Sequence, residues 1–382
     1  MDTMDSAQIE SMLGEFRRNV NIIQATGIGQ LFGPAHFPSF LGKSLALMCG
    51  ATGEQDGTLS RYLSAIPSET TLNERRLLYN FFLNFWDGQF DVLEIGPFLG
   101  GTSRAIALGM LHRGDRQGSV KLFTYDKFRD YYQPEQLLTT LAPMFEAGIL
   151  GDESRDLIRR SNRFKEVFDL LHRGHDYAEL LEAHVGALPS APGEPEDPES
   201  TFALPDGRFY SAVFVDGAKS WFGTKRFMTL ALAQTLPGAY YIFQDYGAHT
   251  CFWIPVFLEV MKAKFQLVAF VDHTYVYRQL APVSAVEIDA AFPDSPLAFS
   301  VADFAGIFRN LYLTALESDN TYTLLNYQLQ HAAALSYLGH KEAARDRIVD
   351  LLKTPHALQH QHWILNALRT PTYTPEGNID LF

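Results

Sequence analysis

The chain has 382 residues, more than twice the roughly 150 residues of an average domain. Its 44 Asp and Glu residues outnumber its 31 Lys and Arg residues, which gives a formal net charge of −13. This excess of acid argues against nucleic-acid and anionic-membrane partners, because both require a basic surface. With 47% apolar and only 20% charged residues, the chain has enough apolar side chains for a large core. We therefore expect a soluble globular protein.

The cysteine content and the first residues indicate a location. Cys49 and Cys251 are the only two cysteines, too few for a disulfide framework or a cysteine-based zinc site. The first six residues, Met1 to Ser6, include two aspartates where a secretory signal would be basic. No apolar run reaches the ~18 residues that span a bilayer. These observations predict a cytoplasmic protein.

Helical periodicity dominates the beginning of the chain. Apolar residues recur at helical spacing within residues 7–31, and the glycines and prolines of residues 27–38 end this pattern. A second helix is predicted from Thr71 to Trp86. We assign residues 1–88 to a helical N-terminal extension that carries no motif of its own.

Short apolar runs bounded by turn residues predict a β-sheet in the middle of the chain. Four of them have the character of buried parallel strands: Val92–Ile95, Leu122–Tyr125, Ala212–Val215 and Tyr240–Phe243. Three further strands are predicted at Leu180–Val185, Phe265–Val271 and Thr274–Leu280. Because helical segments separate several of these strands, we expect a doubly wound, Rossmann-like α/β sheet of seven strands.

Helices and one long insertion complete the predicted organisation. We assign residues 89–283 to a single α/β domain with an insertion at about 129–200, whose helices fall at 134–150 and 154–171. The proline-rich acidic segment 189–200 predicts an exposed loop. A helical C-terminal extension follows at 284–382. In it, Ala332–Pro355 resembles one tetratricopeptide-type hairpin, and because one such unit cannot form a solenoid, we favour a packed helical appendage.

Polar residues follow several of the predicted strands at their carboxyl ends, where open α/β sheets bind their ligands. Asp126, Asp216 and the pair Gln244-Asp245 each follow a strand. The first strand runs into Glu94-Ile95-Gly96-Pro97-Phe98-Leu99-Gly100-Gly101-Thr102-Ser103, where the glycines let the backbone approach a ligand. Its Gly-x-x-x-Gly spacing differs from the Gly-x-Gly-x-x-Gly of dinucleotide enzymes.

An acid followed by this glycine spacing after a first strand resembles motif I of class I S-adenosylmethionine (SAM)-dependent methyltransferases. The resemblance implies a SAM site formed by Glu94, Gly96, Pro97, Phe98, Gly100, Gly101, Thr102 and Ser103, with Asp126 receiving the ribose hydroxyls and Asp216 close to the cofactor. Each acid also has a structural interpretation. The less favoured interpretation of Asp126 is a loop acid or helix cap, and Glu94 is also typical of a buried acid in a hydrogen-bond network at a strand end.

Two later segments extend this resemblance. Residues 214–225, Phe-Val-Asp-Gly-Ala-Lys-Ser-Trp-Phe-Gly-Thr-Lys, resemble the Asp-Gly-x-His-Ser-Tyr signature of methyltransferase family 24. Residues 236–247, Leu-Pro-Gly-Ala-Tyr-Tyr-Ile-Phe-Gln-Asp-Tyr-Gly, are similar to that family's Leu-x-Pro-Gly-Gly-x-x-x-x-Asp-Asp-Tyr. Macrocin-type sugar O-methyltransferases share this layout, and the three motifs together cover roughly residues 75–280.

The macrocin-type resemblance implies a divalent metal. In such relatives, acids after the fourth and fifth strands hold Mg²⁺, which chelates two vicinal hydroxyls of the acceptor. The matching positions here are Asp216, Gln244 and Asp245. Oxygen ligands of this kind suit Mg²⁺, but Gln244 replaces one carboxylate by a neutral carbonyl and lowers the charge of the site. A metal requirement therefore stays open.

The general base is equally open. Methyl transfer to a hydroxyl requires loss of its proton, which a positioned base or a cation promotes. The family signature commonly places Asp or His after Asp-Gly, whereas this chain has Ala218 and Lys219. The candidates are Asp216, Lys219 (if its pKa lies well below the usual ~10.4) and His249. His273 is a further candidate, although a surface or packing role is the simpler interpretation of either histidine.

An aromatic group near the second and third motifs has two interpretations. Its rings either line an acceptor pocket or belong to the core, and the core is favoured for the last two: Trp221, Phe222, Tyr246, Phe252 and Trp253. The identity of the acceptor does not follow from any of these residues.

The sequence thus predicts a SAM-dependent O-methyltransferase for a small polyhydroxylated acceptor, such as a sugar or a secondary metabolite. Ala218, Lys219 and Gln244 keep an alternative open, a methyltransferase-fold binding or scaffold protein without activity. A nicotinamide-dependent oxidoreductase is disfavoured by the glycine spacing. Because apolar helical extensions often make subunit contacts, we expect a homodimer.

Overall fold

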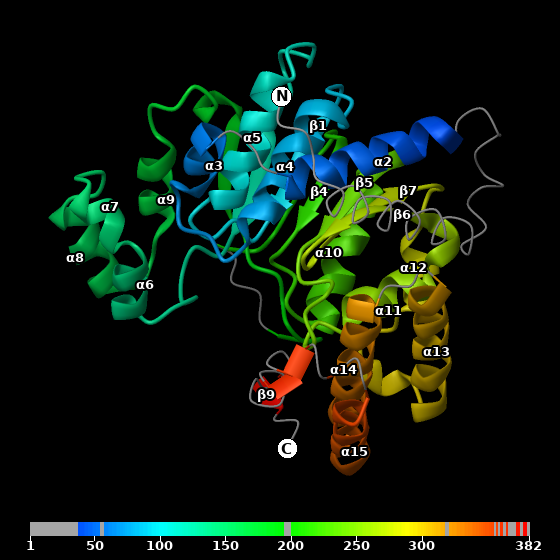
Figure 1. The fold of residues 1–382 in the computed structure, drawn as a ribbon. Helices are drawn as coiled ribbons and strands as arrows, with labels where there is room; N and C mark the ends of the chain where they lie inside the picture. Colours follow the sequence, from blue (N-terminus) through cyan, green and yellow to red (C-terminus); the bar gives the residue numbers. More distant parts are fainter. Residues whose placement is uncertain are drawn as a thin grey trace. The chain divides into compact units, whose positions relative to one another are not determined.

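The computed structural model describes residues 37–53, 57–194, 200–317 and 321–354, with short stretches thereafter at 357, 360–361, 364–365, 372–374 and 377–379. The predicted helix within residues 7–31 lies outside this part of the chain. The contacts divide the chain into two compact units (Figure 1). The N-terminal unit consists of Leu47–Leu188 and Glu196–Gly217, and the C-terminal unit of Met1–Ala46, Pro189–Pro195 and Ala218–Phe382. Each is described by itself.

Four parallel strands form the sheet of the N-terminal unit: β1 (Asp91–Ile95), β2 (Leu122–Asp126), β3 (Leu181–Val185) and β4 (Tyr210–Val215). β1 pairs with β2 and with β4, and β2 pairs with β3. Every residue of β1 and β4 is buried. This explains why these strands read as continuous apolar runs in the sequence.

Three helices, which contact one another, lie around the first strand of this unit. α3 (Gly57–Ser64) precedes α4 (Leu72–Asn84), and α5 (Gly101–His112) follows β1. α4 begins with a capping box in which Thr71 and Glu74 each bond the other's backbone amide. Gly109 on α5 lies against α4, because a Cβ there would be only 2.5 Å from the carbonyl oxygen of Tyr79. A larger residue would push the two helices apart.

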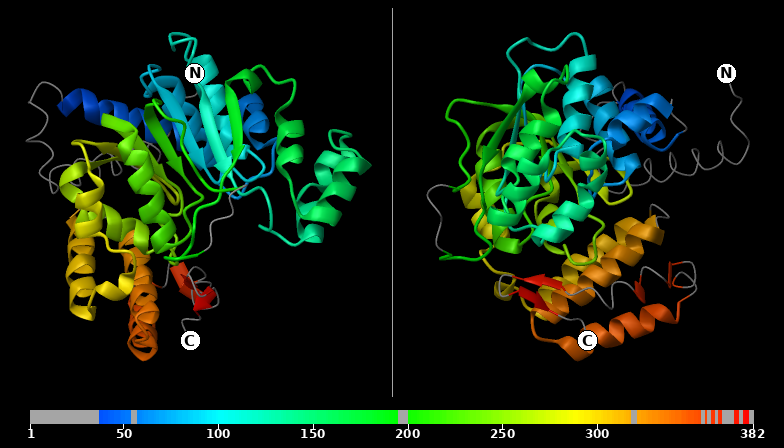
Figure 2. Two further views of the ribbon diagram at one scale, coloured as in Figure 1. Left: turned by 180° about the vertical axis from the view of Figure 1, so that it is seen from behind. Right: turned by 90° about the vertical axis from the view of Figure 1, so that its left-hand side faces the viewer.

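The insertion after β2 folds into a helical lobe on the N-terminal unit (Figures 1 and 2). Each of its two predicted helices is broken in two, giving α6 (Pro134–Thr140), α7 (Ala142–Glu146), α8 (Asp152–Ser161) and α9 (Lys165–His172), followed by the short helix η2 (Ala178–Leu180). α7 starts at the residue before Pro143, and Asn162 in a left-handed conformation (φ 49°) ends α8. The lobe shares one apolar core with Leu99 and Phe128.

In the C-terminal unit, β5 (Thr235–Phe243), β6 (Phe265–Val271) and β7 (Thr274–Gln279) are joined by antiparallel pairing of β7 with both neighbours. β5 starts five residues before the predicted Tyr240, but its register with β7 runs from Tyr240 to Phe243. The Pro237-Gly238 pair, quoted above as part of the third motif, lies in the remaining part of β5. Helices α10 (Trp221–Ala233) and α11 (Trp253–Val260), with η3 (Lys262–Lys264), complete this region.

Helices make up most of the described chain between Ala285 and Leu352, and a short β-hairpin follows. This part of the chain contains α12 (Ala285–Ala291), η4 (Pro296–Ala298), α13 (Val301–Glu317), α14 (Thr321–Tyr337) and α15 (Lys341–Leu352), then the hairpin β8 (Thr372–Thr374) and β9 (Gly377–Ile379). α13 packs on α14 and α14 on α15 (Figure 1). The predicted hairpin at Ala332–Pro355 corresponds to the second half of α14 and to α15. An earlier helix, α2 (Phe37–Thr52), opens the described chain.

The strand order of the large sheet is β3-β2-β1-β4-β5-β7-β6, with β7 antiparallel. The predicted doubly wound sheet of seven strands is confirmed. The predicted domain boundaries at residues 88 and 283 stay a prediction. Among the helices in the described part of the chain, none has the length and apolar composition to cross a membrane.

Candidate functional site

The loop between β1 and α5 has an unusual backbone. Gly96, Phe98 and Gly100 all have positive φ angles, of 81°, 53° and 91°. A Cβ on Gly96 would lie 2.5 Å from the amide nitrogen of Gly217, and one on Gly100 would lie 1.9 Å from Nε2 of His172. Both positions therefore require glycine for conformation and for space. The predicted glycine loop thus lies close to Gly217, which follows β4, and to the last residue of α9.

Glu94, on β1, holds this loop in place. Its side chain is fully buried, and it accepts hydrogen bonds from the Thr102 hydroxyl at 2.7 Å and from the Ser103 hydroxyl at 2.5 Å. Burial raises the pKa of Glu94 to about 7, the hydroxyl donors oppose that rise, and the charge of Asp216 adds to it. Glu94 thus ties β1 to the first turn of α5, and the hydroxyls of Thr102 and Ser103 are turned toward it.

Asp126 braces the same loop from β2. Its Oδ2 accepts the amide of Phe98 at 3.1 Å, and its Oδ1 accepts the amide of Phe128 at 2.8 Å. Burial raises the pKa of Asp126, and these amide donors oppose the rise. The bond to Phe98 compensates a bulky residue for its left-handed backbone, which costs about 1–2 kcal/mol. These two amide bonds give Asp126 the predicted role of a loop acid, and its role as a cofactor ligand stays a prediction.

A buried polar group behind the loop escaped sequence analysis. His172 on α9 bonds the Tyr177 hydroxyl through Nδ1 at 3.0 Å, and burial lowers the pKa of His172 to about 3. The Arg104 guanidinium on α5 lies over the Tyr62 ring, 3.9 Å from its centroid. His172 is therefore neutral, and it fills the space that a side chain at Gly100 would need. Nothing in the local sequence of α9 predicts this contact.

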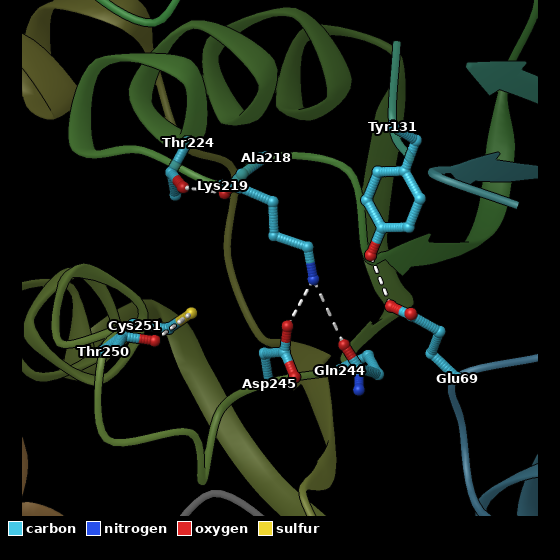
Figure 3. A network of polar contacts seen from close by, with 9 residues as sticks. All are labelled: Glu69, Tyr131, Ala218, Lys219, Thr224, Gln244, Asp245, Thr250 and Cys251. Atoms are coloured by element: carbon cyan, nitrogen blue, oxygen red, sulfur yellow. Dashed lines mark hydrogen bonds and ion pairs between the residues drawn. The ribbon is translucent and has the colours of Figure 1, made fainter. Parts of the chain in front are cut away.

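Aromatic rings surround Phe98 in the N-terminal unit. Its ring centroid lies 5.2 Å from that of Tyr131 and 5.7 Å from that of Tyr132. Both tyrosine hydroxyls donate to the carboxylate of Glu69, and Figure 3 shows the bond from Tyr131. These tyrosines follow β2 closely and were also missed, because two adjacent tyrosines in a loop carry no motif.

Three predicted residues meet in the C-terminal unit (Figure 3). The Lys219 ammonium donates to Oε1 of Gln244 at 3.3 Å and forms an ion pair with Oδ2 of Asp245. Gln244 is buried, whereas the side chains of Lys219 and Asp245 are 41% and 26% exposed. The sequence placed all three among the candidate site residues but did not predict that the lysine would pair with the other two.

The backbone on both sides of this cluster is fixed. Ser220 caps α10 by accepting the Gly223 amide, and Thr224 donates to the carbonyl of Ala218, so Lys219 is held immediately before a helix. Asp245 has a left-handed backbone (φ 62°).

The turn that follows Asp245 is supported from α14. The Ala248 amide bonds the Asp245 carbonyl at 3.0 Å. From α14, Gln330 donates to the carbonyls of Tyr246 at 2.7 Å and Ala248 at 2.9 Å. The C-terminal extension thereby supports the turn that carries Asp245, a role that sequence analysis did not predict.

The described residues do not fit the implied Mg²⁺ site. Two of its three predicted donors, Gln244 and Asp245, already bind the Lys219 ammonium. No group of three or more His, Cys, Asp or Glu side chains within the described ranges is arranged to hold a metal ion. A metal at these oxygens would have to displace a lysine.

The remaining candidates lie on three separate segments of the chain. Asp216 directly follows β4, and its amide bonds the carbonyl of Ile95 at 3.0 Å. His249 is buried between β5 and α11, and His273 lies in the turn between β6 and β7. The base therefore stays a prediction for Asp216, Lys219 and His249.

The aromatic group is largely core. Trp221 stacks on Phe292, with ring centroids 3.8 Å apart, and donates its indole N–H to the carbonyl of Pro293. The Tyr246 hydroxyl bonds that of Tyr327 at 2.7 Å. Four of the five rings are buried: Trp221, Tyr246, Phe252 and Trp253. These contacts favour the packing interpretation over a pocket lining.

Comparisons with known proteins give similarity only at the level of structure. No family model and no curated protein matches the sequence. Among solved structures, the O-methyltransferase NovP is 16% identical, with 64% of this chain and 99% of that one covered and a TM-score of 0.36. A putative O-methyltransferase from Klebsiella pneumoniae is 14% identical, with 61% and 94% covered and a TM-score of 0.34.

A third solved structure is an O-methyltransferase from Bacillus cereus in complex with S-adenosylhomocysteine (SAH). It is 12% identical, with 68% of this chain and 99% of that one covered and a TM-score of 0.30. The deciding observation is the order of the strands in this chain, with an antiparallel β7 between β5 and β6. The chain has the methyltransferase fold.

Proposed function

We propose that this protein is a SAM-dependent O-methyltransferase that acts on a small polyhydroxylated acceptor. The observation that carries the proposal is the β1–α5 loop, in which Gly96, Phe98 and Gly100 adopt left-handed conformations directly after a buried acid. In open α/β sheets this first crossover is a ligand site, because its backbone can approach a ligand and the next helix begins there.

The residues of the loop suit a cofactor with a polar tail and a ribose. Glu94 is committed to Thr102 and Ser103, so we assign it a bracing role under the loop. Asp126 is bonded to two amides and retains acceptor positions for vicinal ribose hydroxyls. Gly96, Pro97, Gly100 and Gly101 would supply backbone surface to the methionine part of SAM.

Methyl transfer from SAM to a hydroxyl group needs no reagent other than SAM, the acceptor and a base. The bond from sulfur to the methyl carbon breaks and a bond from that carbon to the acceptor oxygen forms. The sulfonium becomes the thioether SAH, and the acceptor hydroxyl releases its proton to a base. Much of the rate in such a transfer comes from holding the two reactants in line. Asp216 and His249 are the proposed groups for the proton, because the Lys219 side chain is paired with Asp245.

The partly exposed pair Lys219 and Asp245 supports a hydroxylated acceptor. An ammonium donates hydrogen bonds and a carboxylate accepts them, so together they match the donor and acceptor character of a hydroxyl group. A purely apolar acceptor would shield this ion pair from water without offering it any further hydrogen bond.

A calorimetric titration of the full chain with SAM and with SAH tests the proposal. We expect one site per chain with micromolar affinity. The second step is a panel of sugars and phenols with SAM, with a mass increase of one methyl group in a product as the expected result. A folded preparation that binds neither SAM nor SAH contradicts the proposed function.

The ion pair of Lys219 with Asp245 also favours a second candidate, a SAM-binding protein without transferase activity. Pairing of the only basic side chain in this cluster removes a ready base. Binding of SAH with no methylated product across the panel would support this second candidate over the first.

A further inference from the structure

We propose that the Lys219 ammonium is the resident cation of this site, in the position of a divalent metal ion, so that methyl transfer by this protein requires no metal. The proposal rests on the proposed function for its chemical meaning, and on the contacts of Lys219 for its structural claim. It concerns a lysine that the sequence suggested only as a base.

Two adjacent residues supply oxygen atoms to one cation. The amide oxygen of Gln244 and a carboxylate oxygen of Asp245, adjacent in the chain after β5, converge on one Nζ atom (Figure 3). Neutral and charged oxygens are the donors that Mg²⁺ selects. In this protein the same donors bind an ammonium, and Lys219 directly precedes Ser220, the N-cap of α10.

The net charge of the oxygen donors also suits an ammonium. Gln244 is neutral, so the adjacent pair Gln244-Asp245 carries one negative charge, which a single ammonium balances. A dication added at these oxygens would meet the fixed positive charge of Lys219 at close range and be repelled. Replacement of a carboxylate by Gln244 and introduction of Lys219 are thus two changes in the same direction.

The side chains of Lys219 and Asp245 are both partly exposed to solvent. Ion pairs with this much exposure contribute little to folding stability. Lys219 and Asp245 nevertheless lie on fixed backbones, Asp245 in a left-handed conformation that an ordinary surface pair would not need. A strained residue that holds an accessible charge is typical of a functional site. There an ammonium can stabilise the negative charge that develops on an acceptor oxygen.

The test of the structural claim needs no activity. Mn²⁺ is titrated into the wild type and into Lys219→Met and followed by electron paramagnetic resonance. We expect no binding to the wild type at millimolar Mn²⁺, and Mn²⁺ affinity at least about tenfold higher in Lys219→Met, because the competing cation is gone. Lys219→Arg keeps a cation and should bind no more Mn²⁺ than the wild type.

Lys262→Met is the matched control, since Lys262 forms an ion pair with Glu259 in the same unit, 2.8 Å apart. It should leave Mn²⁺ binding at the wild-type level. Micromolar Mn²⁺ binding by the wild type that is lost in Asp245→Asn would overturn the proposal. Equal Mn²⁺ affinity in the wild type and Lys219→Met would overturn it too.

The test of the functional claim uses the chelator EDTA. We expect the same rate of SAH formation with and without EDTA, and a kcat about 100-fold lower in Lys219→Met with unchanged SAH affinity. If SAH binds but EDTA abolishes the rate, this inference fails and the proposed function stands. If SAH does not bind at all, the proposed function fails, and the Mn²⁺ titration alone still decides the position of Lys219.

Discussion

Glu94 in the N-terminal unit is fully buried and bonded to two hydroxyls, whereas Asp245 in the C-terminal unit is partly exposed and paired with an ammonium. Both acids lie at the end of a strand, and this pattern by itself does not separate them. In the structure, desolvation raises the pKa of Glu94 to about 7, so near neutrality it is partly protonated.

The difference separates acids that hold the structure from acids that face a ligand. The carboxylate oxygens of Glu94 and Asp126 accept hydrogen bonds from hydroxyls and amides of the loop. Removal of either carboxylate should therefore lower the stability of the fold more than it lowers activity. Asp245 and Lys219 bond each other at an accessible position, and removal of either should change chemistry first. The following substitutions test this contrast, from the largest expected effect to the smallest.

Gly96→Ala should have the largest effect. It combines an unfavourable left-handed backbone with a Cβ 2.5 Å from the amide nitrogen of Gly217, so we expect SAH affinity to fall more than about 100-fold by calorimetry. Gly174→Ala is the control, because Gly174 has nearly the same φ (80°) with no atom within 4 Å of an added Cβ. Equal loss of affinity in both variants would contradict a specific role of the loop.

Glu94→Gln should change the pH dependence of stability. Because the folded pKa lies above the unfolded value, Glu94 favours folding below about pH 4.5, and this contribution is lost as pH rises through about 7. Each pKa unit corresponds to about 1.4 kcal/mol, so the wild type loses roughly 3 kcal/mol over this window. The melting temperature of Glu94→Gln should therefore rise relative to the wild type between pH 5 and pH 8. A difference in melting temperature between the two proteins that stays constant over this pH range would show that burial does not raise the pKa of Glu94.

Gln330→Leu should destabilise the C-terminal unit. It leaves the carbonyls of Tyr246 and Ala248 without their donor in a buried place, at a cost of about 2 kcal/mol in the free energy of unfolding. Gln328→Leu, on the same helix and only partly buried, should cost less than about 0.5 kcal/mol. Denaturant unfolding of both variants measures the difference, and equal costs would remove the support we assign to Gln330.

Asp126→Asn should have the smallest effect on stability. One amide bond is kept and one is replaced by an unfavourable contact between two N–H groups, so we expect a loss of about 1 kcal/mol. If Asp126 also receives ribose hydroxyls, SAH affinity should fall about tenfold in calorimetry. Unchanged SAH affinity would show that Asp126 only holds the loop through its amide bonds and does not bind the cofactor.

Elements with strong local patterns were predictable. β1, β2 and β4 appear as apolar runs because both of their faces are buried, and the Gly96 loop is recognisable because it demands glycine. β5 was predicted too short, since its Pro237-Gly238 pair indicates a turn. The helices of the insertion were predicted too long, because helical periodicity continues past Asn162, whose left-handed backbone ends α8.

The partners of the site residues could not be predicted. His172 lies against Gly100, and Gln330 bonds the turn after Asp245, although in both cases the residues are far apart in the sequence. Such contacts depend on the register of whole elements and leave no local pattern. Lys219 and Asp245 were both predicted as site residues, but their pairing depends on where α10 begins relative to the end of β5.

Hydrogen–deuterium exchange of the full chain with and without saturating SAH tests the central claim most directly. Binding at the β1–α5 loop predicts slower exchange in peptides that cover Gly96–Ser103 and Asp126–Phe128, with exchange in α13 unchanged. Unchanged exchange in the loop at saturating SAH, or protection confined to other segments, would contradict the assignment of this loop as the cofactor site.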